Sequence, residues 1–287
     1  MTNQYIMIRY LSLLLSVAVT VEAGAQVLRL GKGGKDLPGG RAFAQSISDT
    51  SLSLDHREKI IFRMIKKGDL PGFLHELTPV TDSAVIKGQT VHILYYVAPD
   101  YLSIGNDTDF LYMPMTPMLA QRVADKLHCS LPTRKMVDNI YRQAAIKLTP
   151  QPIPPSAAMI TVPVFQAHTD SVTKQLSPLL QLHNRSALTA GNKKDIVISN
   201  KIYGEPTPRV VIYGWHKPGG TPIQPLYNKH KNTWADYSHG VRLVQNKVFV
   251  DGKPSTLQKV LADPDLCLLL SDEGVIDRDF YPVEKHY

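Results

Sequence analysis

The pattern of hydrophobic and polar residues predicts a helix and then a buried strand in the first third of the chain. Residues 55–67 place apolar side chains at helical spacing, and this helix begins at Asp55 and ends before Gly68. Residues 91–97 are dense in Val, Ile, Leu and Tyr, which is typical of a buried strand, and Pro99 follows it. Both elements are expected to bury apolar surface.

Two further helices follow in tandem. Thr116 and Pro117 open the first, which is predicted to run to about His128, and Thr133 opens the second, which is predicted to reach about Leu148. Each helix carries an apolar stripe, and residues 130–132 provide a short turn between them. The pair is therefore predicted to form a packed helical hairpin.

The second half of the chain alternates strands and helices without a regular β-α-β period. Residues 149–156 contain four prolines, so they form a stiff, extended linker. After it we expect a strand at 159–164, a helix at 169–176 and strands at 195–199 and 209–213. The pattern predicts an α+β fold in which a mixed sheet accompanies the helical hairpin.

The proline-rich linker divides the predicted fold, which is either one domain or two closely packed subdomains. On the second interpretation, residues 51–148 form a helix-rich N-terminal subdomain. Residues 157–287 then form a mixed α/β C-terminal subdomain that carries the candidate site. About 260 residues of globular composition are enough for either arrangement.

The first 25 residues have the features of a signal peptide. Arg9 precedes an apolar run over residues 11–21, and Ala23-Gly24-Ala25 matches the motif that signal peptidase recognises. The run is too short to span a bilayer, and no later stretch is apolar enough to do so. We therefore predict a secreted or periplasmic protein with no transmembrane span after cleavage, which begins with a flexible lead-in over residues 26–50.

The charge balance bears on the partner. The formal net charge is +7, which suits an exported protein that works among cell-wall polymers or acidic polysaccharides, although ordinary solubility explains it equally well. Basic and aromatic residues do not alternate in the way that nucleic-acid binding needs, so no nucleic-acid partner is predicted.

The chain has two cysteines, Cys129 and Cys267. An oxidising compartment would allow a disulfide between them. The alternatives are two buried free thiols, or Cys129 as a nucleophile beside His128. The sequence leaves these alternatives open.

Residues 213–242 are the segment richest in candidate chemistry. They contain both tryptophans and three of the ten histidines, and a long loop of this composition is typical of a functional site. The candidate catalytic residues are His239, His216, His230, Asp236 and Ser238. The candidate substrate-binding residues are Trp215, Tyr213, Trp234, Tyr237 and Arg242.

The spacing of these residues limits the chemistry. Ser238 and His239 are adjacent, so they point to opposite sides of a strand and do not pair with each other. His230, Asp236 and His239 match none of the helical zinc motifs, so zinc is an alternative that the spacing does not favour. No other cofactor is predicted.

Five residues resemble a known motif. Residues 238–242 read Ser-His-Gly-Val-Arg, which resembles the Ser-His-Gly-Cys-x-Arg motif of L,D-transpeptidases, exported enzymes that cross-link peptidoglycan. Residues 213–216 lie upstream, where that family has another histidine motif. Val241 stands in the position of the nucleophilic cysteine and Arg242 is one residue closer, so the cysteine chemistry of the family is not implied for this chain.

These observations lead to two hypotheses. The first is an exported hydrolase that acts on a cell-wall or extracellular polymer, either glycan or peptide, with its site in residues 213–242. The second is a non-catalytic exported protein that binds glycan on the rings of Trp215 and Trp234. The hydrolase hypothesis predicts that His239→Ala loses function without loss of folding.

Overall fold

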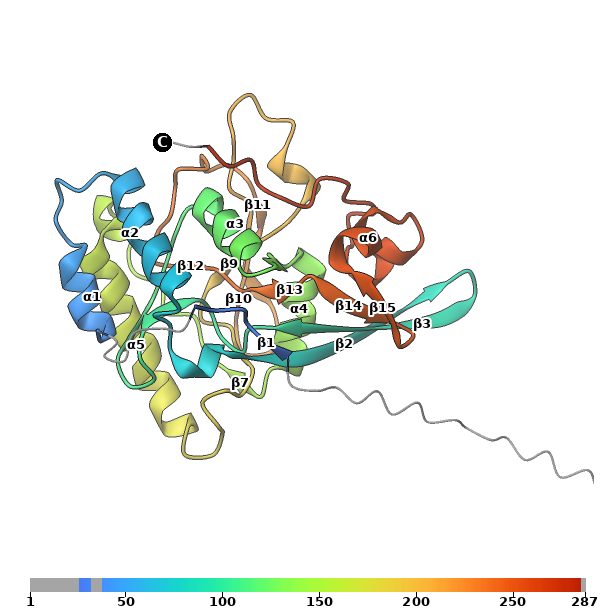
Figure 1. Ribbon diagram of the computed structural model, residues 1–287, viewed down its shortest axis with the longest axis horizontal. Coiled ribbons are helices and arrows are strands. Elements are labelled where there is room, and N and C mark those ends of the chain that lie inside the picture. Colours follow the sequence, from blue (N-terminus) through green and yellow to red (C-terminus); the bar gives the residue numbers. More distant parts are fainter. Residues whose placement is uncertain (1–25, 32–37, 285–287) are drawn as a thin grey trace, which may run out of the picture.

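The fold of this chain is mixed α+β, as the sequence predicts. A computed structural model describes residues 26–31 and 38–284, with 31% of the chain in helices and 25% in strands (Figure 1). The predicted signal peptide, residues 1–25, lies outside the described residues.

Helices are concentrated on one side of the molecule, where α1, α2 and α5 lie together (Figure 1). The described residues form six α-helices, which are α1 (Gly40–Ser46), α2 (Leu54–Lys67), α3 (Pro117–Lys126), α4 (Arg134–Gln143), α5 (Val162–Leu179) and α6 (Leu257–Ala262). Short 3-10 turns occur at η1 (Gly72–Leu74), η2 (Ala157–Ile160), η3 (Asn200–Ile202) and η4 (Leu266–Leu269).

The helix ends follow from local chemistry. The side chains of Ser53, Thr116 and Thr133 each accept a backbone N–H in the first turn of α2, α3 and α4, so three free donors are satisfied. Gly68 ends α2 in the left-handed region with φ 88°, which glycine adopts at little cost. The cap of α2 is Ser53, two residues before the predicted start at Asp55.

The larger sheet joins strands from both halves of the chain. Its order is β1-β2-β3-β13-β6, and β14 pairs with both β3 and β15. The β2–β3 hairpin is long and projects from the body of the molecule (Figure 1). The strands are β1 (Gln26–Val27), β2 (Glu76–Ile86), β3 (Gln89–Val97), β6 (Cys129–Ser130), β13 (Val244–Gln245), β14 (Lys247–Val250) and β15 (Lys253–Thr256).

The smaller sheet has the order β11-β10-β9-β12 and carries much of the 213–242 segment. Its strands are β9 (Lys194–Ile196), β10 (Ile212–His216), β11 (Pro222–Tyr227) and β12 (His239–Gly240). Two short pairs complete the strands: β4 (Ser103–Gly105) with β5 (Phe110–Tyr112), and β7 (Ile146–Lys147) with β8 (Thr189–Ala190).

One hydrophobic core runs through both halves of the chain. It includes Ile65 and Leu119 from before the proline-rich residues 149–156, and Val210 and Leu261 from after them. The proline-rich segment has no regular structure and is fixed to the body through Ile153, whose N–H donates to Tyr237 Oη at 2.6 Å. The two predicted halves therefore share one sheet and one core.

The two tandem helices are joined by a strand. β6 lies between α3 and α4 and pairs with β13. α3 packs mainly against α2 and β6, whereas α4 packs mainly against β10 and β2. The two helices therefore pack mainly against other elements and not against each other as the predicted hairpin would. α4 ends at Gln143 and not near Leu148, because Ile146 and Lys147 turn into strand β7.

Three segments differ from the sequence predictions. Residues 159–164, predicted as a strand, form the end of η2 and the start of α5. The predicted lead-in contains strand β1 and helix α1, in which Phe43 is buried, while residues 32–37 lie outside the described residues. The predicted loop over 213–242 contains the β10–β11 hairpin and strand β12.

Among the described residues, no helix is long and apolar enough to cross a membrane.

Candidate functional site

The 213–242 segment borders a pocket that opens between α4 and the β10–β11 hairpin. Its volume is about 560 Å³, which lies in the range of pockets that hold small ligands. We call it the His216 pocket. Its principal lining residues are Asp138, Tyr141, Arg142, Lys147, Tyr213 and His216.

A histidine–carboxylate pair lies in the wall of this pocket. His216 Nε2 is 2.8 Å from Asp138 Oδ1, and the ring of Tyr141 stacks on the His216 ring with centroids 4.5 Å apart. A carboxylate only accepts hydrogen bonds, so Nε2 carries the ring proton and donates a hydrogen bond to Asp138. Nδ1 is left as the unprotonated nitrogen of the ring, and no hydrogen bond joins it to the described residues.

Tyr213 fixes the carboxylate from a second side. Its hydroxyl donates to both oxygens of Asp138, at 2.9 and 3.1 Å, and burial raises the pKa of the Tyr213 hydroxyl well above its usual value. The side chain of His216 is 3% exposed and that of Asp138 is 34% exposed, so the pair meets solvent mainly at the carboxylate. Tyr213 therefore acts as a donor that orients Asp138.

The backbone of β10 makes this arrangement possible. Tyr213 and His216 are three residues apart, so in a regular strand they would face opposite sides of the sheet. Between them, Gly214 has φ 104° and Trp215 has φ 58°, and these two positive values interrupt the alternation. A bulky residue such as Trp215 rarely adopts positive φ, and such strain is common beside functional sites.

We expect Gly214→Ala to lower the free energy of unfolding by about 1–3 kcal/mol, because alanine is strained at this φ. The added Cβ would also lie 3.2 Å from Val137 Cγ1 and 3.5 Å from His216 Nδ1. The matched control is Gly219→Ala, which shares a positive φ of 96° but meets nothing within 4 Å. Urea unfolding should show the larger loss for Gly214→Ala; equal losses would contradict a tight contact between the added Cβ and Val137.

Two cations stand at the rim of the His216 pocket. Arg142 and Lys147 are exposed, and Lys147 Nζ lies 5.4 Å from the centroid of the Tyr141 ring. Arg142 donates to Asn139 Oδ1 at 3.0 Å and forms no ion pair with the described residues. The pocket therefore combines a general-base candidate with positive charge that favours an anionic ligand.

His239 belongs to a different, buried group that also contains Asp236 and Ser238. Ser238 Oγ donates to Asp236 Oδ1 at 2.5 Å, whereas His239 Nε2 is 3.8 Å from Asp236 Oδ2. The two ring nitrogens of His239 are buried and have no hydrogen-bond partner among the described residues. Ser238 therefore pairs with the carboxylate and not with a histidine, so these residues do not form a nucleophilic triad.

Burial lowers the pKa of His239 from 6.5 to about 4, although Asp236 opposes this shift. Between these two values the unfolded chain binds a proton at this site and the folded chain does not, so stability falls as pH falls. We expect the free energy of unfolding of His239→Gln to fall less than that of wild type as pH falls, by up to about 3 kcal/mol. Unfolding in urea between about pH 7 and about pH 4.5 measures the difference, with His56→Gln as an exposed control. Parallel pH profiles for wild type and His239→Gln would contradict the assignment.

His230 and Trp234 lie beside the Asp236 group, whereas Trp215 is buried in the core. His230 stacks on Trp234 with ring centroids 5.1 Å apart, and Trp234 Nε1 donates to Asp236 Oδ2 at 3.1 Å. Trp215 is 4% exposed and contacts Tyr237 edge-to-face, so it offers no open surface for a sugar ring. The three histidines therefore do not converge on one centre.

Arg242 is buried and holds the two halves of the chain together. Its Nη1 donates to Ala98 O at 2.8 Å, its Nη2 donates to Thr189 O at 2.7 Å, and Nε is 4.0 Å from Asp195 Oδ1. At 1% exposure it is not available to clamp a substrate anion. The structure gives it a role in packing.

The structure also bears on the two cysteines and on the alternative of a zinc site. Cys129 and Cys267 are both buried free thiols, and burial raises the pKa of Cys129 to about 12, which disfavours the nucleophilic thiolate. Within residues 26–31 and 38–284, no three His, Cys, Asp or Glu side chains come together in a way that could hold a metal ion.

Four residues of the His216 pocket were absent from the sequence-based site: Asp138, Tyr141, Arg142 and Lys147. The first three lie on one side of α4, at positions i, i+3 and i+4. The apolar residues of this helix were recognised as core, but its polar side gave no signal that it would meet β10.

Comparison with known proteins adds no assignment. No protein-family model matches the chain, and no curated protein or solved structure is significantly similar to it. Val241, at the position of the transpeptidase cysteine, is buried in the core with 1% exposure. The functional argument therefore depends on the geometry of the pocket.

Proposed function

We propose that this protein is an exported hydrolase that cleaves an amide or ester bond in an anionic cell-wall or extracellular polymer. The observation that carries the proposal is the His216–Asp138 pair in a pocket with Arg142 and Lys147 at its rim. An oriented histidine is the commonest general base in hydrolytic enzymes, and a carboxylate on its other nitrogen stabilises the charged ring.

In the proposed reaction, His216 Nδ1 takes a proton from a water molecule whose oxygen attacks the carbonyl carbon. The protonated ring is stabilised by Asp138, and the proton then passes to the leaving nitrogen or oxygen as the carbon–heteroatom bond breaks. Water is the nucleophile because the pocket walls carry no serine, threonine or cysteine in the described part of the chain.

The carboxylate content of the pocket favours acyl chemistry over glycoside cleavage. Most glycosidases place two carboxylic acids on either side of the bond that they cleave. Asp138 is the single acidic residue in the described lining of the His216 pocket, and its oxygens are engaged by His216 and Tyr213. A histidine base that acts on a carbonyl needs no second carboxylate.

The rim cations favour a substrate with a carboxylate or phosphate near the scissile bond. Guanidinium and ammonium groups form their strongest hydrogen bonds with such anions. The net charge of +7 supports the same choice, because it draws the protein towards acidic polymers.

The test is release of soluble fragments from peptidoglycan and from a panel of acidic polymers that carry ester or amide bonds. We expect release by the wild-type protein with and without a chelator, and loss of release in His216→Gln. Retention on a polymer without release would favour the binding-only alternative, and equal release by His216→Gln would exclude His216 as the base.

A further inference from the structure

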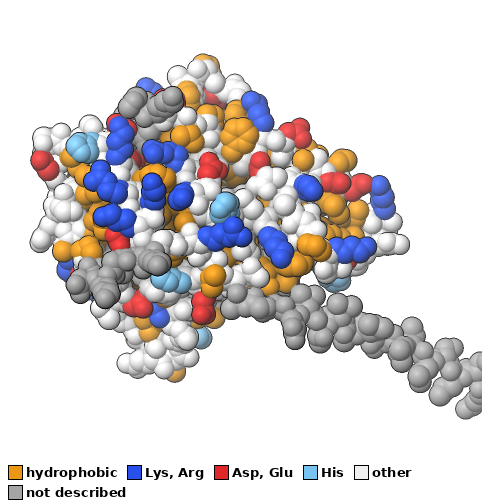
Figure 2. All heavy atoms as spheres, viewed as in Figure 1, with side chains coloured by type: hydrophobic (Ala, Val, Ile, Leu, Met, Phe, Trp, Pro, Cys, Tyr) orange, Lys and Arg blue, Asp and Glu red, His pale blue; other side chains and the backbone are white. Residues whose placement is uncertain are grey.

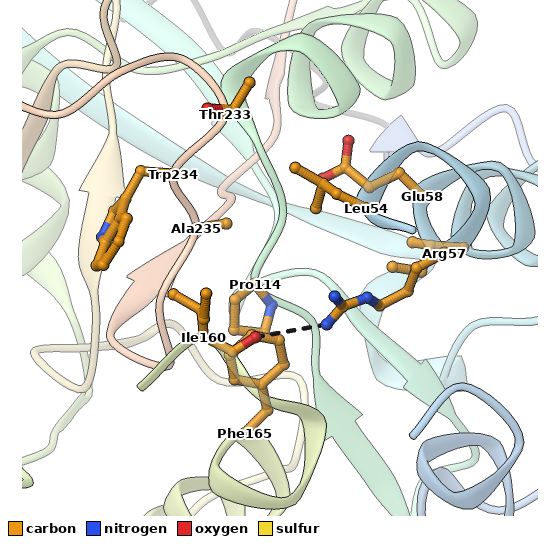
Figure 3. A pocket seen from close by; sticks show the side chains of 10 residues that line it. Leu54, Arg57, Glu58, Pro114, Ile160, Phe165, Thr233, Trp234 and Ala235 are labelled. Carbon is orange, nitrogen blue, oxygen red and sulfur yellow. Dashed lines mark hydrogen bonds between the residues drawn. The ribbon is translucent and has the colours of Figure 1, made fainter. Parts of the chain in front are cut away.

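A second, smaller cavity lies away from the His216 pocket, at the N-terminal end of α2. Its volume is about 100 Å³ (Figure 3). We call it the Arg57 pocket. Its walls come from α2, from η2 and α5, and from the segment that precedes Asp236. Its lining residues include Leu54, Arg57, Ile160, Phe165, Trp234 and Ala235.

The walls of the Arg57 pocket are mostly apolar. Leu54, Ile160 and Phe165 surround the space with Trp234 and Ala235 opposite α2 (Figure 3). A cavity of about 150 Å³ with such a lining holds a benzene ring. The Arg57 pocket is therefore large enough for a branched aliphatic group of four or five carbons.

One cation borders this apolar space. The Arg57 guanidinium reaches across the pocket to Ile160, whose carbonyl accepts one long hydrogen bond of 3.4 Å from Nη1 (Figure 3). Its buried Nε has no partner among the described residues, and burial lowers the pKa of the group. A guanidinium with unused donors beside an apolar cavity is suited to a ligand carboxylate.

The neighbouring acid, Glu58, acts on this cation through its charge, which raises the pKa of Arg57 and partly opposes the larger effect of burial. Glu58 Oε1 and Oε2 accept from the backbone N–H and the hydroxyl of Thr116, at 2.6 and 2.7 Å. Glu58 therefore caps the start of α3 with both oxygens.

The surface over α2 carries exposed basic side chains. Figure 2 shows Lys and Arg side chains gathered over α2 and its border with α3. α2 contributes Arg63, Lys66 and Lys67, which are exposed, and α3 contributes Lys126.

We propose that the Arg57 pocket binds a small carboxylate that carries a branched aliphatic group, with the carboxylate on Arg57 and the aliphatic group against Phe165, Ile160 and Trp234. The proposal stands apart from the hydrolase proposal, because it needs no turnover and involves none of the residues of the His216 pocket.

The first experiment is a titration with 3-methylbutanoate, in which binding is measured by the fluorescence of Trp234 and by the melting temperature. We expect saturable binding in the millimolar range, which is typical of a ligand of this size. The uncharged amide of the same acid should bind at least about tenfold more weakly, because it lacks the charge that pairs with Arg57. Trp234→Phe should abolish the fluorescence change, since the other tryptophan is buried elsewhere.

The matched variants are Arg57→Met and Arg63→Met, which remove one cation each from the same helix. Arg57→Met should weaken binding of 3-methylbutanoate by about tenfold or more, whereas Arg63→Met should leave it within about twofold. Ala235→Leu fills the cavity and provides a second test that retains the charge; it should also abolish binding while the melting transition remains cooperative.

Three results would overturn the proposal. They are no saturable binding by wild type, equal affinity for the acid and its amide, and equal weakening by the two arginine variants, which would indicate attraction to the basic surface as a whole.

Discussion

His216→Gln is expected to lower the rate of fragment release by about 10²- to 10⁴-fold, which is the usual contribution of a general base. Glutamine can still donate a hydrogen bond to Asp138, so the link that His216 Nε2 makes at 2.8 Å can be kept while the basic nitrogen is lost. The loss should therefore lie in turnover, with the fold retained.

The assay compares His216→Gln with two other variants. Asp138→Asn should also lower the rate by several orders of magnitude, because it removes the carboxylate that stabilises the charged ring, and its amide can donate to Nε2 and so leave the ring proton on Nδ1. His75→Gln changes an exposed histidine outside the pocket and should keep the wild-type rate. Melting temperatures of all three establish that they are folded, and a wild-type rate in folded His216→Gln would refute the proposed mechanism.

The largest loss of stability is expected from Arg242→Met, at about 3–5 kcal/mol. Methionine matches the length of the arginine stem but leaves the carbonyls of Ala98 and Thr189 without their donors. It also removes the cation 4.0 Å from Asp195 Oδ1, whose pKa burial already raises to about 6. Both effects weaken the folded state.

Arg142→Met is the matched control for this prediction. Arg142 is exposed at the rim of the His216 pocket, so its loss should change stability by less than about 1 kcal/mol. Denaturant unfolding measures the stability of both variants. Arg142→Met should also release fragments from an anionic substrate more slowly than wild type, which the fragment-release assay measures. Equal stability of the two variants would contradict the packing role of Arg242.

The sequence predicted best where local chemistry decides the structure. Thr116 and Thr133 cap α3 and α4 as expected, because a hydroxyl before an apolar helical stripe satisfies free N–H groups wherever the helix packs. The strand predicted over residues 159–164 was wrong because tertiary packing, and not local preference, decides the structure there. Their β-branched residues favour a strand, but Val162 and Phe165 are buried on one side of α5.

The candidate site was predicted in part. Tyr213 and His216 were identified from the composition of their segment, but their partner Asp138 lies 75 and 78 residues away in the chain. Nothing local in α4 indicates that contact. Arg242 was assigned to substrate because its charge was visible and its burial was not.

The placement of β3 in the larger sheet has a consequence for how the chain reaches its folded state. β3 pairs along one edge with β2, its neighbour in sequence, but its other edge is completed by β13 and β14 from the far end of the chain. The hairpin can form early, yet it keeps an unpaired edge until those strands arrive, and such edges promote association between chains. A newly made chain therefore depends on residues 244–250 to protect a strand that is made long before them.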